Sequence, residues 1–261
     1  MTRFGPWTPR LKQIPEDRQL SGPNSVTVQT GFVNVIAELW ARASTAGAPL
    51  EPAVAMIIAG IALAALLLAW PLVRTLATIC HEGGHALVAV LTGRRLRGIR
   101  VHSDTSGLTV TRGRPTGLGM VATLLAGYPA PSLLGLGAAW LVATGHSAGL
   151  LWLLVAGLAV MLLAMRNFYG ALAVLLMGTV LALASWYATG QVSSWLGTLV
   201  AWTLLLAGPR PVIELFPNRS PTSDAAQLAR LTHLPRLFWA FGWLALTLTA
   251  LAVGGRWLLA L

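Results

Sequence analysis

The sequence contains few charged residues, and their scarcity excludes several classes of protein. Asp, Glu, Lys and Arg make up 10% of the 261 residues, whereas a soluble domain carries roughly 25%. None of the four occurs from Pro115 to Met165 or from Asn167 to Pro209. Because about 20 apolar residues cross a bilayer core, these runs predict membrane spans. With 56% hydrophobic residues, the chain is neither a soluble enzyme nor a disordered protein.

Cysteine and lysine are almost absent as well. The single cysteine, Cys80, has no partner for an internal disulfide, which excludes a secreted disulfide scaffold. Lys12 is the only lysine, and the other 17 of the 18 basic residues are arginines. No basic stripe with interleaved aromatic residues lies outside the apolar runs, so we expect no nucleic-acid partner.

The positions of the basic residues predict how the chain crosses the membrane. If the N-terminus is cytoplasmic, four segments on that side hold 16 of the 18 basic residues, namely 1–50, 93–114, 166–167 and 209–236. Cytoplasmic loops of membrane proteins are enriched in Lys and Arg. The charge distribution therefore predicts a multi-pass protein of the cell membrane with a cytoplasmic N-terminus.

The chain divides into two parts by composition. Residues 1–50 are polar and predict a partly disordered cytoplasmic segment without the apolar core of a signal peptide. Residues 51–261 form the transmembrane part. Its apolar runs lie at about 52–73, 75–92, 118–143, 148–165, 169–189, 194–208 and 237–255. The expected fold is thus an all-α polytopic membrane protein with about seven transmembrane helices.

The one polar stretch with strand character lies between the second and third runs. Ile99 and Val101 alternate with polar residues, and so do Leu108 and Val110, while 103–107 supplies turn residues between them. This pattern predicts a small membrane-associated β-hairpin.

The sharpest motif for chemistry is His81-Glu82-x-x-His85 within the second apolar helix. Residues four apart share a helix face, so both imidazoles can bind one cation, and Glu82 can reach a metal-bound water as general base. Ionisable residues in an apolar span are costly unless they pair or bind something. The pattern favours a metal site, with a structural hydrogen-bonded cluster as the alternative. Two imidazoles with one carboxylate and an open position are typical of catalytic zinc.

Spacing alone leaves the third ligand open. The candidates are Asp224, Asp104, His102 and His233. Asp224 has a structural alternative, since it could cap a helix in a capping box completed by Gln227.

Asn167 is a further candidate for catalysis, because an amide can stabilise the oxyanion of a tetrahedral intermediate. The simpler explanation is a polar residue at a helix end facing water.

These motifs resemble the site-2-protease (M50) family of intramembrane zinc metalloproteases, in its M50B-like branch. The resemblance covers about residues 70–250. It rests on the His-Glu-x-Gly-His form of 81–85, on Gly107, on Ala126-Gly127-Tyr128 with Pro131 and Gly135, and on Ser223-Asp224-Ala225 with Leu228-Ala229. It implies Zn²⁺ as cofactor and Asp224 as the third ligand. The Asn-Pro-Asp-Gly or Leu-Asp-Gly sequence of better-known members is absent.

The resemblance also implies that an extended substrate adds a strand to the β-structure after the histidine helix. The alternative is a basic hairpin that rests on anionic lipid headgroups. We therefore expect hydrolysis of a peptide bond in a membrane-protein or membrane-associated substrate, with the lipid bilayer as the other partner. Two alternatives remain: a catalytically silent M50-like scaffold or regulator, and a metal or solute transporter.

Overall fold

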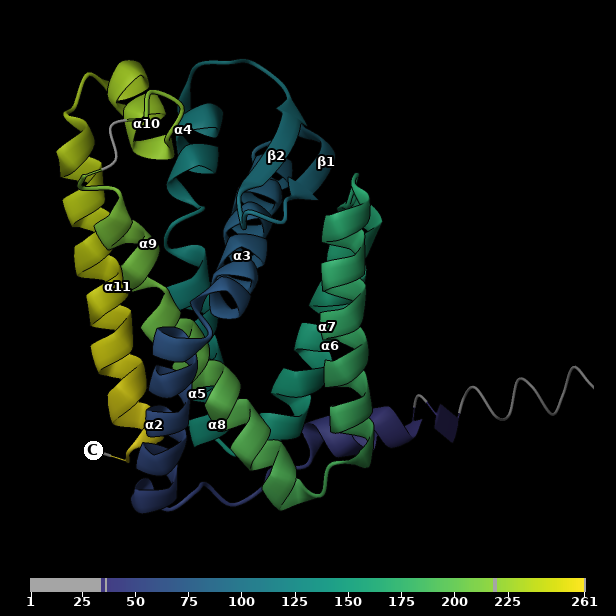
Figure 1. The fold of residues 1–261 in the computed structure, drawn as a ribbon. Coiled ribbons are helices and arrows are strands. Elements are labelled where there is room, and N and C mark those ends of the chain that lie inside the picture. Colours follow the sequence, from purple (N-terminus) through teal and green to yellow (C-terminus); the bar gives the residue numbers. More distant parts are fainter. Residues whose placement is uncertain (1–33, 36, 218–219, 261) are drawn as a thin grey trace, which may run out of the picture. The chain divides into compact units, whose positions relative to one another are not determined.

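The computed structural model describes residues 34–35, 37–217 and 220–260. The chain divides into two compact units, 1–40 and 41–261, and all elements named below belong to the second (Figure 1). Most of the predicted N-terminal segment 1–50 lies outside the described residues.

The second unit consists of helices and one hairpin. In chain order these are α2 (Pro52–Leu68), α3 (Trp70–Leu91), β1 (Arg95–Val101), β2 (Gly107–Arg112), α4 (Leu118–Leu125), α5 (Ala130–Ala143), α6 (Ser147–Ala164), α7 (Phe168–Tyr187), α8 (Gly190–Ala207), α9 (Pro209–Glu214), α10 (Asp224–Thr232) and α11 (Arg236–Leu258). Within the described residues, four stretches are long and apolar enough to cross a membrane, and up to six if each of two bent helix pairs counts as one span. The predicted all-α polytopic membrane fold with a small hairpin is confirmed.

Two bends distinguish this arrangement from seven straight spans. Helices α2 and α3 meet at 99°, so the predicted spans 52–73 and 75–92 form one bent pair. Helices α4 and α5 meet at 65°, so the predicted run 118–143 forms a second bent pair. Both α3 and α5 begin with a proline in the first turn, where its missing N–H costs no helical hydrogen bond.

An arginine from α9 stabilises the bend between α2 and α3. A helix end leaves carbonyl groups without a partner, and Arg210 donates a hydrogen bond of 3.1 Å to the carbonyl of Leu66 in the last turn of α2. The same guanidinium lies 3.9 Å from the ring centroid of Trp70. Glu214 forms ion pairs with Arg74 at 3.5 Å and with Arg210 at 3.8 Å, so α9 is tied to both helices at the bend.

The hairpin packs one face against α3 and the α6–α7 turn. Ile99 and Val101 of β1 are fully buried in an apolar cluster with Ile79 of α3 and Met165. The outer edge of β1 is covered as well, because the carbonyl of Ile99 accepts a hydrogen bond from the N–H of Arg166. The hairpin is therefore wedged between the histidine helix and the α6–α7 turn.

Helix α10 lies beside α4 and α11 at the same end as the hairpin (Figure 1). Its apolar side is Ala225 and Leu228, which are buried against Leu124 of α4 and Trp243 of α11. This packing fixes the first turn of α10, where Asp224 lies.

Candidate metal centre

Helix α3 carries the His81–His85 motif along its packed side. His85 and Glu82 are buried, and His81 is half-buried. The two imidazole rings are edge to face with centroids 4.5 Å apart, as expected for residues four apart on one helix face.

Asp224 of α10 completes a group of three ligands, 139 residues after His85. The Nε2 atoms of the two histidines are 3.0 Å apart, and Oδ2 of Asp224 lies 3.2 Å from each of them. Two ligands at about 2.0–2.1 Å from a tetrahedral zinc ion are about 3.3 Å apart. The three atoms thus form a nearly equilateral triangle of the size that one small cation requires, and the group could hold a metal ion.

The hydrogen bond on the far side of His85 orients its ring for this role. The carbonyl of Thr123 can only accept, so the Nδ1–H of His85 donates to it at 2.7 Å. In a neutral imidazole the lone pair is then on Nε2, which faces the carboxylate of Asp224 and Nε2 of His81. With Nε2 of His81 also unprotonated, the three atoms direct lone pairs toward one point, as the binding of a metal ion requires.

Asp224 is free to face the histidines because its neighbour caps the helix. The hydroxyl of Ser223 accepts a hydrogen bond from the N–H of Ala226 at 3.3 Å, so the alternative interpretation of Asp224 as the N-cap is wrong. Gln227 donates to the carbonyl of Thr222 instead.

The break between α4 and α5 forms the wall behind the imidazoles. A Cβ at Gly127 would collide with the rings of His81 and His85. The next residue, Tyr128, lies edge-on to His81 with ring centroids 4.7 Å apart and stacks at 4.8 Å on Trp243. The Ala-Gly-Tyr sequence therefore supplies a residue without a side chain where the backbone approaches the two candidate ligands.

Strand β2 covers the carboxylate of Glu82, which is only 5% exposed. The hydroxyl of Thr109 donates to Oε2 of Glu82 at 2.6 Å and also lies 3.1 Å from the Glu82 carbonyl. A Cβ at Gly107 would collide with Oε1. One carboxylate oxygen is thus fixed by a hydrogen bond, and the glycine leaves room beside the other.

The structure places the remaining candidates elsewhere. The amide of Asn167 pairs with Val101 of β1, since Nδ2 donates to its carbonyl at 2.7 Å and Oδ1 accepts from its N–H at 3.2 Å. The predicted oxyanion role of Asn167 stays a prediction.

The other possible ligands also lie apart from the triangle within the described residues. Asp104 accepts two hydrogen bonds from Ser106, from its hydroxyl and its N–H, and they lower the pKa of this carboxyl. His102 lies 3.3 Å from the same hydroxyl. His233 ends α10 in a left-handed conformation.

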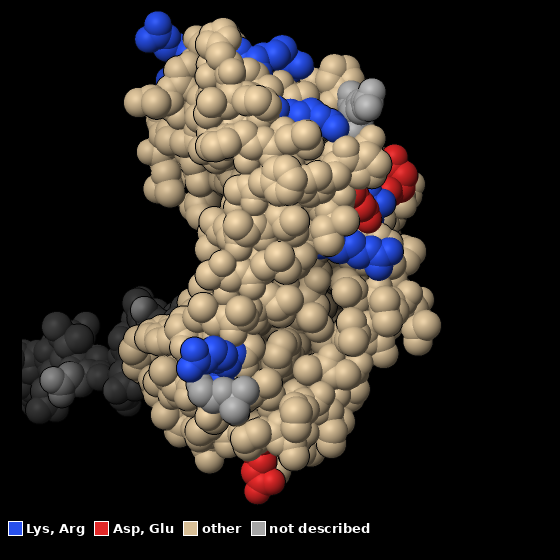
Figure 2. All heavy atoms as spheres, turned by 90° about the vertical axis from the view of Figure 1, so that its left-hand side faces the viewer, with Lys and Arg blue, Asp and Glu red and all other residues tan. Residues whose placement is uncertain are grey.

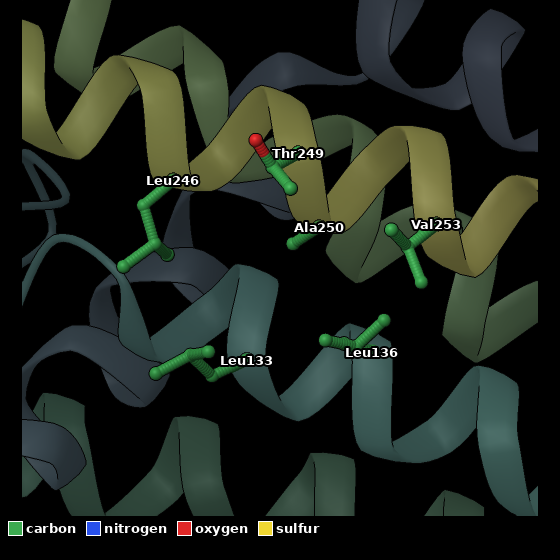
Figure 3. A pocket seen from close by; sticks show the side chains of 6 residues that line it. All are labelled: Leu133, Leu136, Leu246, Thr249, Ala250 and Val253. Carbon is green, nitrogen blue, oxygen red and sulfur yellow. The ribbon is translucent and has the colours of Figure 1, made fainter.

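An apolar groove between two helices offers no second chemical site. It has a volume of about 230 Å³ and lies between α5 and α11 (Figure 3). Its lining is Leu133, Leu136, Leu246, Thr249, Ala250 and Val253. The only polar side chain, Thr249, donates to the carbonyl of Ala245.

Sequence reasoning did not identify Thr109 or Thr123 as parts of this site. The alternation along β2 places Thr109 on one face, but nothing local shows that this face covers Glu82. Thr123 contributes its backbone carbonyl, which has no residue-specific signal.

Comparison with known proteins agrees with this geometry. A family model described as Peptidase M50B-like matches residues 53–254, which include every residue of the candidate metal centre. Neither a curated protein nor a solved structure matches the chain significantly.

Proposed function

The chain belongs to the Peptidase M50B-like family, and on this premise we propose that it is an intramembrane zinc metalloprotease. Its reaction is hydrolysis of a peptide bond in a membrane-protein or membrane-associated substrate. The observation that carries the proposal is the triangle of His81, His85 and Asp224 with the buried carboxylate of Glu82 on the same helix turn. Metal binding alone does not need Glu82, whereas hydrolysis needs a base.

The residues present suit zinc, and their roles follow from their positions. His81, His85 and Asp224 would hold the ion, which when bound would polarise the scissile carbonyl and acidify the attacking water. Glu82 takes the proton from the water and passes it to the leaving amine. Thr109 fixes Oε2 of Glu82 through its hydrogen bond, so that the orientation of the base is set before substrate arrives.

Strand β2 offers the edge to which an extended substrate can add. Along an antiparallel strand, the N–H and C=O groups of one residue point to one side of the strand, and those of the next residue point to the other side. The backbone groups of Ile99 and Val101 in β1 point away from β2, toward Arg166 and Asn167. Their partners on β2, Thr109 and Gly107, therefore direct theirs to the opposite, outer edge of the hairpin.

This outer edge lies at the general base. The side chain of Thr109 bonds Glu82, and no backbone hydrogen bond from another described segment reaches Thr109 or Gly107. A substrate strand paired there would be held by main-chain hydrogen bonds next to the carboxylate that moves the proton.

The surroundings of the protein follow from its apolar helices. It is a multi-pass membrane protein, and we place it in the cell membrane. The predicted cytoplasmic N-terminus required 52–73 and 75–92 to cross the membrane separately, whereas α2 and α3 form one bent pair, so this orientation stays a prediction.

The test of the proposal is cleavage in a reconstituted bilayer. The full chain in liposomes is expected to cleave a co-reconstituted single-span peptide labelled on both sides of its span. The chelator 1,10-phenanthroline should stop cleavage, and added Zn²⁺ should restore it. Zinc bound without cleavage of any of a panel of such peptides would favour the silent scaffold. Zn²⁺ flux into protein-containing liposomes, without cleavage, would favour the transporter.

Replacing Thr109 with valine is expected to lower kcat about tenfold, since Oε2 of the buried Glu82 then lacks a hydrogen-bond donor. Valine keeps the β-branched shape, so KM and bound zinc should stay unchanged. Thr109→Ser should restore kcat, because it returns the hydroxyl. Thr111→Val, on the same face of β2 but bonded to Arg94, is the matched control. Equal kcat for Thr109→Val and Thr111→Val would show that the hydrogen bond is not used.

A further inference from the structure

The solvent-side face of the hairpin combines arginines with apolar side chains. Its arginines come from both strands, and Leu108 and Val110 lie between them with 51% and 40% of their surface exposed. The arginines of this face, all exposed, are Arg95, Arg97, Arg100 and Arg112. We refer to these six residues as the arginine face.

Two arginines of this face are direct cross-strand partners. Arg95 pairs with Arg112 in the antiparallel register, and like charges directly opposite each other destabilise a sheet. None of the four guanidinium groups has a hydrogen bond or ion pair within the described part of the chain. The only carboxylate of the hairpin is Asp104 at its turn, which is engaged by Ser106. The arginine face thus concentrates positive charge that no carboxylate of the described residues neutralises.

The surroundings of the face indicate a lipid rather than a water-soluble anion. The hairpin directly follows the end of α3, a helix of the membrane-embedded part, where Leu91 and Val90 are largely exposed. Figure 2 views the molecule from the side of α10 and α11 and shows blue side chains near the end where α10 lies, with the red ones farther from that end. Exposed arginines that follow an exposed valine and leucine at a helix end suit the boundary between acyl chains and the phosphate layer. The guanidinium group also binds phosphate through two parallel hydrogen bonds.

We propose that the arginine face binds the phosphate groups of anionic phospholipids and so holds the hairpin at the membrane surface. The binding uses the side chains on the face, whereas substrate addition uses the backbone at the outer edge of β2. The two can therefore occur together, and lipid binding does not depend on the proposed proteolysis.

The test compares lipids that differ only in charge. The full chain in neutral detergent micelles is titrated with fluorescent phosphatidylglycerol or phosphatidylcholine, and binding is followed by anisotropy. Wild type is expected to bind phosphatidylglycerol at least tenfold more tightly. An arginine near anionic lipid contributes about fivefold, so Arg97→Gln with Arg100→Gln should weaken phosphatidylglycerol binding by at least tenfold. Binding of phosphatidylcholine should not change.

A matched control removes the same charge elsewhere. Arg42→Gln with Arg256→Gln alters two arginines at the opposite end of the molecule, beside Trp186 of α7 and in the last turn of α11, and should leave phosphatidylglycerol binding within about twofold of wild type. Equal losses in both double variants, or no loss in the hairpin variant, would overturn the proposal. So would tighter binding of a polyglutamate peptide than of phosphatidylglycerol micelles, which would identify an acidic protein partner instead.

Discussion

Replacing Glu82 with glutamine is expected to lower kcat by about 10²–10⁴-fold while zinc stays bound. Glutamine has the same shape, and its amide oxygen can still accept the hydrogen bond from Thr109. What it cannot do is accept a proton from water and return it to the leaving amine. The measurement pairs the cleavage rate with zinc content, so that loss of the base is separated from loss of the metal.

The control for Glu82 is the carboxylate of Glu214. It lies in ion pairs with Arg74 and Arg210 at the bend between α2 and α3. Glu214→Gln should leave kcat within a few-fold of wild type, since surface ion pairs contribute little free energy. A Glu82→Gln protein that cleaves as fast as Glu214→Gln would remove Glu82 from the mechanism.

Gly127→Ala is expected to weaken zinc binding by about 10–100-fold, the range seen when groups that orient metal ligands are altered. The new methyl group would collide with the imidazoles of His81 and His85. Neither ring can yield easily, because His85 is held by the carbonyl of Thr123 and His81 lies against Tyr128. A zinc titration with a competing chelator measures the change.

Gly137→Ala in α5 is the control for this substitution, because a Cβ there meets nothing within 4 Å. Alanine favours a helix by about 1 kcal/mol over glycine, so this variant should bind zinc as wild type does. If Gly127→Ala also bound zinc normally, the imidazoles would not be clamped as the geometry indicates.

Much of the fold was accessible from sequence because the bilayer imposes a simple rule. Long uncharged runs such as 167–209 can only be spans, and the alternation at 99–101 and 108–110 gave the hairpin. The 99° bend between α2 and α3 was not predicted. The residues that stabilise this bend are Arg210 and Glu214. Both lie far along the chain in α9, so no local sequence pattern reveals the bend.

The candidate metal centre was predictable in part. The spacing of His81 and His85 indicates two ligands, since four residues bring both rings to one helix face. Asp224 lies 139 residues after His85 in the sequence, and the tertiary packing of α10 brings the two together. Spacing therefore could not choose Asp224 over Asp104, His102 or His233. The resemblance to a family favoured it. The structure adds a physical reason, since Ser223 caps the helix and leaves Asp224 free.

The zinc content of purified protein tests the central claim most directly. One group of ligands built from His81, His85 and Asp224 predicts about one zinc ion per chain in wild type and close to none in Asp224→Ala. Asp104→Ala, which removes a carboxylate that bonds only Ser106, should keep the full amount. Equal zinc in wild type and Asp224→Ala, or no zinc in wild type after supplementation, would contradict the account.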